Sequence, residues 1–598
     1  MNSKPCLLEN RLRELPPEAV TLLDPYEKNA FALEISYLKS LNPDRLLRGF
    51  CDIAGIESTA ELYGGWETSA IQGHTMGHYL TALAQAYAFS GDSELKKAAD
   101  YVISVLKKCQ QESGYLAAIP EEHYIKLENG ETEGTWVPWY SMHKILSGIL
   151  AVYKLTGSTE ALEVASRLGD WVFKRTSLWS LETMEKVLRT EYGGMNDCLY
   201  ELYSVTKNDR HLYAAECFDE IPLFDALYKG EDILDGKHAN TTIPKFLGAL
   251  NRYTVLSECD EYYLTAAVNF WDTVVKSHSY ITGGNSEWEH FGKARVLDAE
   301  RTECNCETCN TYNMLKLTRR LFMLTGEAKY RDFYERTFIN AILSSQNPET
   351  GMTTYFQPMA TGFFKVYSSP FDHFWCCTGS GMENFSKLGD SIYFCSADSL
   401  YINRLVSSSV SWAEKGLTVI QQTNLPEVKL TVSGNAGAEL VIPIPSWCSE
   451  APALKLNGTE AEARISDGFI RIFRQWQSGD TVEITLPLEI KAHRLPDNEN
   501  AVCFTVGPYV LSADLGEKDM DTSVTGVNVT VPLADKNESG KIRVKGTVTG
   551  WLSHLRDNFE SLGDFTFKLK NTDRELTFSQ HYRQHKKRYG IYFVLEDE

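Results

Sequence analysis

Residues from about 25 to 390 alternate between apolar and polar positions in a way that is typical of paired amphipathic helices. Apolar residues recur at steps of three and four, a short polar turn follows, and a second helical stretch then begins. Glycine marks the turn in three cases, at Gly91, Gly157 and Gly326. The segments with this pattern are 79–106, 144–173, 198–218, 246–275 and 314–343. They predict a degenerate repeat of helical hairpins with variable insertions.

The segments that precede the first helix of each hairpin are rich in Gly, His, Trp, Tyr and Asn. They read GGWETSAIQGHTMGHY, GTWVPWYSMHK, TEYGGMND, DGKHANTTIPK and TGGNSEWEHFG. Side chains that can carry chemistry therefore gather at one end of the hairpins. Six or seven hairpins closed in a ring would form an α/α barrel with these loops at one mouth, and an open solenoid is the alternative. We favour the closed ring, because only closure brings such loops together.

The pattern changes after about residue 395 to short alternating segments that are rich in β-branched and aromatic residues. LTVIQQTN, ELVIPIPSW, FIRIFRQW and AVCFTVGPYVLSA are examples, with Gly, Asn and Asp turns between them. We therefore predict a multidomain α plus β protein. Its expected parts are an α/α barrel domain at 1–394, a β-sandwich at 395–515 and a second small β-sandwich-like module at 516–598.

Composition and charge narrow the class of partner. The 598 residues carry 59 Lys and Arg against 80 Asp and Glu, a net charge of −21. Such an acidic chain repels phosphate backbones and anionic lipids, which argues against nucleic-acid and membrane-surface binding. No run approaches the roughly 18 apolar residues of a membrane span, and the first residues show no signal-peptide pattern. We expect a cytoplasmic protein with a neutral carbohydrate substrate, and the sequence permits a homodimer.

The cysteines include one cluster. Of 14 in the chain, five fall at positions 304, 306, 309, 376 and 377. Thiolates with a carboxylate such as Glu307 suit tetrahedral Zn²⁺. Glu307 and Cys309 share a side only in an extended segment, so we place them before the helix that follows. A closed structural zinc site is an equal alternative. A disulfide between Cys376 and Cys377, or plain core cysteines, fit a reducing compartment less well.

Other candidate residues lie in the loops before the helices. The loop TGGNSEWEHFG offers Glu289 as a general acid, whereas we interpret Glu287 as a surface carboxylate. His74 and His78 lie one helical turn apart, as helix-borne metal ligands do. No third ligand accompanies them, so a hydrogen-bonded or sugar-binding pair is the favoured interpretation.

Ordered motifs along nearly the whole chain resemble one enzyme family. They are GHTMGHYL, WYSMHK, EYGGMND, HANTTIPK, TGGNSEWEHFG, ETCNTYNMLKLTRRLF, YERTFINAIL, TTYFQPM, WCCTGSGMENFSKLGDSIYF and HYRQHKKRYGIYF. The sequence is similar to the β-L-arabinofuranosidases of glycoside hydrolase family 127 and the related family 146, with the helical motifs closer to the latter. The resemblance implies an (α/α)6 barrel with β-sandwich modules, in agreement with the pattern above.

The resemblance also implies a zinc ion beside the substrate. The family's ligands correspond to Glu307, Cys309, Cys376 and Cys377, its nucleophile to Cys376 and its acid/base to Glu289. Four further residues match positions near the family's active site and are expected to bind substrate: His143, His238, Glu335 and Tyr355. Cys304 and Cys306 lie beside the motif, either as extra ligands or as neighbours.

The expected activity is a retaining hydrolysis that releases L-arabinose from β-L-arabinofuranosides in an L-arabinose-containing oligosaccharide. Glu289 would protonate the leaving oxygen, and a water-poor pocket would raise its pKa. One alternative is a related glycosidase for another furanose or a branched acidic sugar. The other is a noncatalytic carbohydrate-binding protein with structural zinc.

Overall fold

A closed ring of helices forms the first part of the protein. The computed structural model describes residue 8 and residues 11–256, 260–462, 464–520, 526 and 540–598. Within these residues, six inner helices each pack against the next, and the last packs against the first. In ring order they are α3 (His74–Ser90), α6 (Pro138–Thr156), α9 (Met195–Thr206), α12 (Ala239–Leu256), α14 (Thr308–Thr325) and α16 (Cys376–Phe385). The predicted (α/α)6 barrel is confirmed, and the open solenoid is excluded.

The outer helices follow their inner partners along the chain, with one exception. They are α4 (Ser93–Cys109), α7 (Thr159–Thr176), α10 (Asp209–Glu216), α13 (Glu261–Ser277) and α15 (Ala328–Thr337), and the last continues into the π-helical turn η4 (Phe338–Leu343). The exception is α16, whose outer partner is α1 (Pro25–Ser40) from the start of the chain. Further helices lie on the outside and at the mouth: α2 (Pro43–Ala54), α5 (Glu122–Asn129), α8 (Leu181–Leu188) and α11 (Ile221–Tyr228). The sixth hairpin thus joins segments that are more than 300 residues apart.

Glycine and capping residues make the hairpin turns. Gly91, Gly157 and Gly326 each follow an inner helix with φ near +70°, a left-handed conformation that side chains rarely adopt. Asp92 and Ser158 then accept backbone N–H bonds at the start of the next helix. These local signals explain why the helix pairs could be located from the pattern alone.

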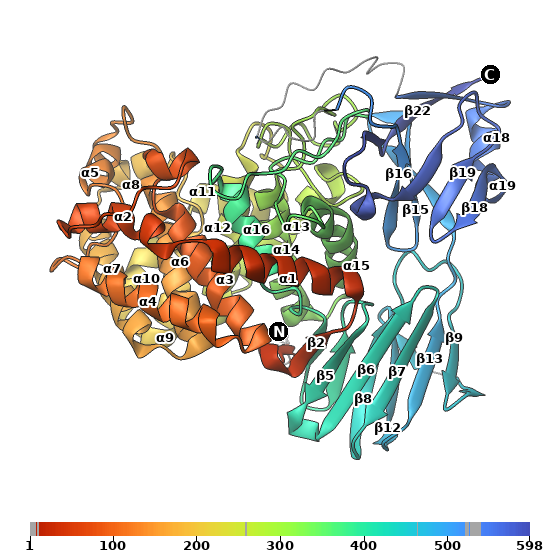
Figure 1. Ribbon diagram of the computed structural model, residues 1–598, viewed down its shortest axis with the longest axis horizontal. Helices are drawn as coiled ribbons and strands as arrows, with labels where there is room; N and C mark the ends of the chain where they lie inside the picture. Colours follow the sequence, from red (N-terminus) through yellow and green to blue (C-terminus); the bar gives the residue numbers. More distant parts are fainter. Residues whose placement is uncertain (1–7, 9–10, 257–259, 463, 521–525, 527–539) are drawn as a thin grey trace.

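Two sheets pack as a β-sandwich below the barrel (Figure 1). The strands are β3 (Tyr393–Cys395), β4 (Ser399–Ile402), β5 (Ser408–Trp412), β6 (Leu417–Asn424), β7 (Glu427–Ser433), β8 (Ala436–Pro443), β9 (Ala453–Leu456), β10 (Thr459–Glu460), β11 (Arg464–Ser466), β12 (Phe469–Trp476) and β13 (Thr481–Thr485). The N-terminal strands β1 (Arg13–Glu14) and β2 (Val20–Leu22) each form an edge of one sheet. The strand order of the first sheet is β1-β3-β4-β8-β12-β11, and that of the second is β10-β9-β13-β7-β6-β5-β2. Their inward side chains form one apolar core.

A third sheet forms the C-terminal module. It contains β14 (Ile490–Leu495), β15 (Asn498–Val506), β16 (Tyr509–Asp514), β17 (Lys541–Val544), β18 (Phe559–Gly563), β19 (Thr566–Leu569), β20 (Thr577–Gln580), β21 (Tyr589–Gly590) and β22 (Phe593–Asp597). Two short helices, α18 (Val548–Leu552) and α19 (Leu555–Asn558), accompany it. The sequence analysis grouped residues 490–514 with the first β module, but they pair with this sheet. The division expected near residue 515 therefore cuts through it.

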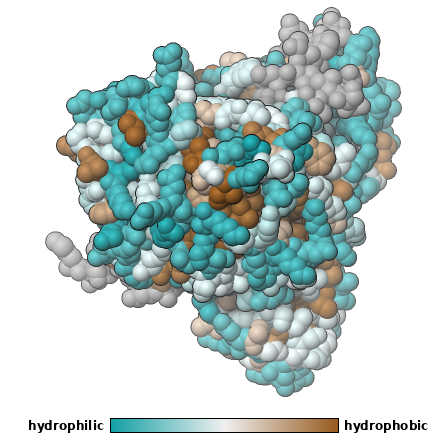
Figure 2. All heavy atoms as spheres, turned by 60° about the vertical axis from the view of Figure 1, so that its left-hand side comes forward, coloured by the Kyte–Doolittle hydropathy of each residue, from teal (hydrophilic) through white to brown (hydrophobic). Residues whose placement is uncertain are grey.

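The surface agrees with the acidic composition. Figure 2 shows a face that is mostly hydrophilic, with hydrophobic side chains gathered near its centre. Among the helices of the described residues, none has the length and apolar character that crossing a bilayer requires.

Candidate active site

Three thiols and a carboxylate converge at one mouth of the barrel. The ligating atoms of Glu307, Cys309, Cys376 and Cys377 all lie within 4.8 Å of one another, and all four residues are buried. The Cys309 and Cys377 sulfurs are 3.3 Å apart, and the Cys376 sulfur lies 3.5 Å from Glu307 Oε1. This is the set that the sequence motifs singled out for a metal.

The N-terminal ends of two neighbouring inner helices position these groups. Glu307 is the N-cap residue of α14, and Cys309 lies in its first turn. Cys376 and Cys377 are the first two residues of α16. The position of Glu307 before the helix agrees with expectation, whereas the prediction that Cys309 precedes the helix is wrong. A helix N-terminus stabilises negative charge, which favours thiolates at these positions.

The electrostatics of the group fit a divalent cation. Burial, together with the negative charge of neighbouring groups, raises the pKa of Cys376, Cys377 and Glu307 well above their usual ranges. Burial also opposes ionisation of Cys309, but hydrogen bonds from the two other thiols lower its pKa to about 7. Glu307 Oε2 is buried without a hydrogen-bond partner. Three thiolates and a carboxylate oxygen match the ligand set and geometry of Zn²⁺.

The two extra cysteines lie apart from this group. Cys306 packs in an apolar cluster with Tyr280 and Met359, and burial raises its thiol pKa. Cys304 belongs to the apolar layer next to the site. Neither contributes an atom to the four-ligand group found among the described residues. Of the two readings left open by the sequence, the structure favours neighbours over ligands.

A chain of contacts joins the thiol group to a carboxylate at the mouth. Tyr355 contacts the Cys376 sulfur at 3.6 Å through its hydroxyl, which also donates a hydrogen bond to Glu289 Oε1. The other oxygen, Glu289 Oε2, lies 3.3 Å from His238 Nε2. Glu289 itself is 30% exposed, so its carboxylate can reach both the buried thiols and an incoming molecule.

The protonation of Glu289 differs from expectation. Burial favours the neutral acid, but hydrogen bonds from His238 and Tyr355 prevail and lower its pKa. Burial would lower the pKa of His238, yet its hydrogen bond to Glu289 and the charge of Glu191 raise it. The prediction of a raised pKa for Glu289 is therefore wrong for the free site. These contacts instead favour the ionised carboxylate of Glu289.

The loop that presents Glu289 has an unusual backbone. Ser286, Trp288 and Glu289 have φ values of 79°, 43° and 70°, in the left-handed region that non-glycine residues seldom occupy. Such conformations persist where surrounding contacts hold them, often at functional sites. Glu287, two residues earlier, accepts a hydrogen bond from Thr302 instead and is not one of the four residues that form the metal-ligand group.

Two residues expected to bind substrate lie elsewhere. Glu335 is 3% exposed, and its carboxylate is held by Arg331 at 2.5 Å and by the backbone N–H of Leu405 at 2.6 Å. It thus joins the barrel to the β-sandwich, and we withdraw it as a sugar ligand. His143 accepts a hydrogen bond from the N–H of Gly194 and lines a cavity deeper in the barrel. None of its contacts reaches the cysteine group.

The paired histidines are structural. His74 Nδ1 lies 3.3 Å from Glu67, and His78 Nδ1 lies 2.6 Å from Glu383, both in fully buried surroundings. Their hydrogen-bonded state agrees with the interpretation favoured from sequence.

The sequence analysis missed five residues around the site. Tyr140 has a buried hydroxyl without a partner, and its pKa is raised by burial and by the charges of Cys376 and Cys309. Glu191 approaches the Glu289–His238 pair. Trp66, Trp136 and Trp288 form an aromatic rim, and the last two are 41% and 48% exposed. Tyr140 lies in the first turn of α6, and the other four lie in the segments before the inner helices, so the composition of these segments was the available signal.

Comparison with known proteins decides the family. The model for the GH127 β-L-arabinofuranosidase catalytic domain matches residues 19–390, and the GH127 middle-domain model matches residues 399–488. The chain belongs to glycoside hydrolase family 127. It is therefore a glycosidase, and we no longer retain the noncatalytic carbohydrate-binding alternative.

Individual relatives of this glycosidase agree. A non-reducing end β-L-arabinofuranosidase from Bifidobacterium longum subsp. longum is 23% identical over 528 residues, which cover 76% of this chain and 78% of the relative. A solved GH127 β-arabinofuranosidase superposes with a TM-score of 0.75 at 18% identity over 98% of both chains. A GH127 β-L-arabinofuranosidase from Geobacillus stearothermophilus T6 gives 0.70 at 20% identity, covering 96% of this chain and 100% of its own. These structures share the barrel and β-sandwich architecture.

Proposed function

We propose that this glycosidase releases L-arabinose from β-L-arabinofuranosides with net retention of configuration, using Cys376 as nucleophile and Glu289 as acid/base. The observation that carries the proposal is the double contact of the Tyr355 hydroxyl with the Cys376 sulfur and the Glu289 carboxylate. The catalytic groups of retaining glycosidases are about 5 to 5.5 Å apart, whereas those of inverting enzymes are about 6.5 to 9.5 Å apart. A single hydroxyl oxygen bridges the Cys376 sulfur and the Glu289 carboxylate. So short a separation supports the retaining arrangement.

Zn²⁺ is part of the proposal, with Glu307, Cys309, Cys376 and Cys377 as its ligands. Burial and mutual repulsion oppose ionisation of these groups, so a bound cation is needed to balance them. When bound, it would keep the thiols deprotonated at neutral pH. The other three negative ligands would also donate electron density to the ion. The ion would then withdraw less from the Cys376 sulfur, which supports the nucleophilic role of this residue.

The chain's residues then divide the reaction into two displacements. The Cys376 thiolate attacks the anomeric carbon, and the bond to the leaving oxygen breaks with its electron pair on that oxygen. Glu289 passes a proton to the oxygen. In the second step Glu289 takes a proton from water, the water oxygen attacks the same carbon, and the carbon–sulfur bond breaks to restore the thiolate. Two inversions give net retention.

His238 positions Glu289 for the first step. Its Nδ1 accepts the N–H of Thr241, so its own N–H lies on Nε2 and points to Glu289 Oε2 at 3.3 Å. A sugar oxygen that approaches Glu289 replaces the Tyr355 hydroxyl as its partner, which makes the carboxylate more basic. Glu289 can then take up a proton from water and pass it to the leaving oxygen.

The substrate class is supported by the names of the relatives and by the rim of the site. An L-arabinose-containing oligosaccharide would extend from the thiol group past Trp288 and Trp136, whose exposed rings can stack on sugar faces. A different furanose, or a branched acidic sugar, is the alternative glycone.

A substrate panel tests this proposal. Chromogenic β-L-arabinofuranosides, other furanosides and acidic pyranosides should be compared with zinc content measured on the same sample, and NMR of an early time point gives the anomer released first. We expect β-L-arabinofuranose from the β-L-arabinofuranoside, loss of turnover in Cys376→Ser and Glu289→Gln, and near-normal turnover in the control Glu287→Gln. An inverted first product, or equal losses at the two glutamates, would contradict the proposal.

A further inference from the structure

A cavity of about 720 Å³ lies inside the barrel, at the end opposite the cysteine group. Its walls are the C-terminal halves of the inner helices, and the strand β1 and residues 389–394 help to close it. The cysteines, Glu289 and Tyr355 do not line it. Its volume falls within the range of pockets that bind small molecules, about 300 to 1,000 Å³.

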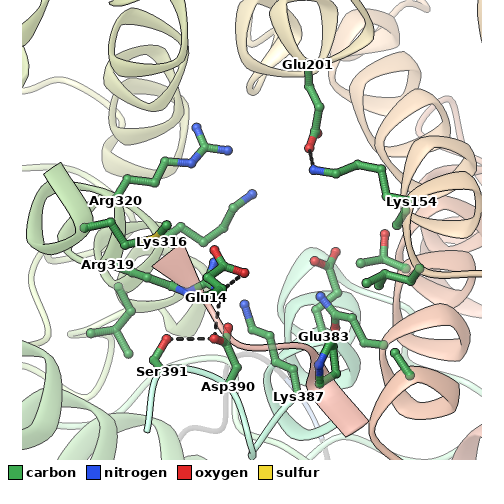
Figure 3. A pocket seen from close by; sticks show the side chains of 18 of the residues that line it. Glu14, Lys154, Glu201, Lys316, Arg319, Arg320, Glu383, Lys387, Asp390 and Ser391 are labelled. Carbon is green, nitrogen blue, oxygen red and sulfur yellow. Dashed lines mark hydrogen bonds and ion pairs between the residues drawn. The ribbon is translucent and has the colours of Figure 1, made fainter. Parts of the chain in front are cut away.

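Positive charge dominates this cavity. Eight lysine and arginine side chains line it, against five carboxylates, in a protein whose net charge is −21. Figure 3 shows Lys154, Lys316, Arg320 and Lys387 reaching toward its open centre. An excess of cations in an enclosed space concentrates positive potential there, because the surrounding protein screens it less than bulk water does.

The carboxylates of the cavity are already engaged. Glu201 pairs with Lys154, and Asp197 pairs with Arg320 at 2.5 Å. Arg319 forms ion pairs with both Glu14, at 2.7 Å, and Asp390, at 2.8 Å. The fifth, Glu383, accepts hydrogen bonds from Tyr312 and lies 2.6 Å from His78 Nδ1.

Five cations of the lining have no ion pair with a carboxylate among the described residues. Arg11 and Lys207 are exposed, whereas Lys144, Lys316 and Lys387 are buried or half-buried. The ammonium groups of Lys316 and Lys387 lie 5.3 and 5.2 Å from the ring centroid of Tyr312, and that of Lys144 lies 5.0 Å from the centroid of Tyr140. An aromatic ring stabilises a nearby cation much less than an anionic partner does.

Nearby carboxylates offset the repulsion among these lysines only in part. Burial, together with neighbouring cations, outweighs the charges of Asp197, Asp390 and Glu383, so the pKa of Lys316 is lowered and that of Lys387 falls to about 8. Water in the cavity would hydrate the ammonium groups but leave their mutual repulsion in place. A bound anion would remove both the repulsion and the lack of partners.

We propose that this cavity binds a small organic anion with two or more carboxylate or phosphate groups, held by Lys316, Lys387 and Lys144. This site is separate from the sugar site and independent of the function proposed there. Lys316 lies halfway along α14 and Lys387 follows the C-cap of α16, whereas the N-terminal ends of both helices carry the cysteine group. A multivalent anion would thus link the middle of α14 to the C-terminal end of α16 and stabilise the barrel.

Calorimetric titration of the zinc-loaded enzyme tests the proposal. The probes are fructose 1,6-bisphosphate and propane-1,2,3-tricarboxylate, which separate the phosphate from the carboxylate source. Fructose at matched ionic strength is the neutral control. We expect saturable one-to-one binding of at least one anion and a rise in Tm with that anion only. No binding of either anion, or a rise equal to that given by sodium chloride, would overturn the proposal.

The double variant Lys316→Gln/Lys387→Gln locates the site. We expect at least a tenfold rise in Kd and loss of the anion-dependent rise in Tm. Its own Tm without anion should equal or exceed that of the wild type, because two unpaired cations are removed. The control Lys97→Gln/Lys108→Gln removes the same two charges from the exposed side of the outer helix α4 and should leave Kd unchanged. Equal Kd values for the double variant and the wild type would place the anion elsewhere and overturn the proposal.

Discussion

Replacing Tyr355 by phenylalanine removes one hydroxyl from the centre of the proposed active site. That hydroxyl is the only group in the described chain seen to contact both the Cys376 sulfur and the Glu289 carboxylate. The ring packs against Trp66, Phe356 and Trp375, and these contacts remain in the variant. The change should therefore affect chemistry much more than folding.

The magnitude follows from the hydrogen bond to Glu289. A bond to a charged acceptor contributes about 1.5 to 3 kcal/mol, and one pKa unit corresponds to about 1.4 kcal/mol. Because the donated bond stabilises the carboxylate, its loss should raise the pKa of Glu289 by about one to two units. The alkaline limb of the kcat/KM profile marks loss of the proton of Glu289, so it should move to higher pH by that amount. The hydroxyl also contacts the Cys376 sulfur, and loss of that contact should lower the plateau of kcat/KM by up to about tenfold.

The assay is a pH profile of kcat/KM on a chromogenic β-L-arabinofuranoside, with thermal unfolding on the same samples. Tyr124→Phe is a matched control, since its buried hydroxyl donates to the carbonyl of Pro138 on another part of the barrel. It should lower stability slightly and leave the profile unchanged. An alkaline limb in the same place for Tyr355→Phe and wild type, with full activity, would refute the reasoning about Glu289.

Three further predictions concern the metal group, the domain junction and the aromatic rim. Cys309→Ser should lower zinc content and activity together, whereas Cys304→Ser should keep both, as metal analysis and rate assays on the same samples would show. Glu335→Gln should lower the free energy of unfolding by about 1 to 3 kcal/mol in urea denaturation without changing KM, because it removes one of the two carboxylates that pair with the buried Arg331 and leaves Asp332 as the other. Trp288→Ala should raise KM about fivefold for an arabinose oligosaccharide and much less for a small chromogenic substrate, since only the longer sugar reaches the rim.

The helical part of the fold was accessible from sequence because its signals are local. Apolar periodicity, the glycines after three inner helices and the capping residues Asp92 and Ser158 all act within a few residues of the turn they define. The pairing of α16 with α1 had no such signal, because it joins the two ends of the barrel. The same holds for β1 and β2, which are too short to recognise and gain their place only through long-range pairing.

For the candidate site, too, the sequence indicated which residues matter but not all of their positions and contacts. Motif order identified the cysteine group correctly, since few roles suit a carboxylate and three thiols in that pattern. Glu335 failed because a motif names a residue without saying which face of a helix it occupies. The direction of the Glu289 pKa also failed, since burial was foreseen but the hydrogen bonds from His238 and Tyr355 were not. Lysines such as Lys316 are single positions in amphipathic helices, so no pattern revealed their common cavity.

The central claim is that the Cys376 sulfur attacks the anomeric carbon, and site-specific labelling tests it most directly. The zinc-loaded enzyme should be treated with a haloacetamide-bearing L-arabinofuranosyl compound, digested and mapped by mass spectrometry, with and without competing substrate. Cys376 lies against both Glu307 and Tyr355 at the base of the mouth and is 5% exposed, so a bound sugar can reach it. We predict that Cys376 is alkylated first and that substrate protects it. Labelling of another cysteine with Cys376 untouched would contradict the account.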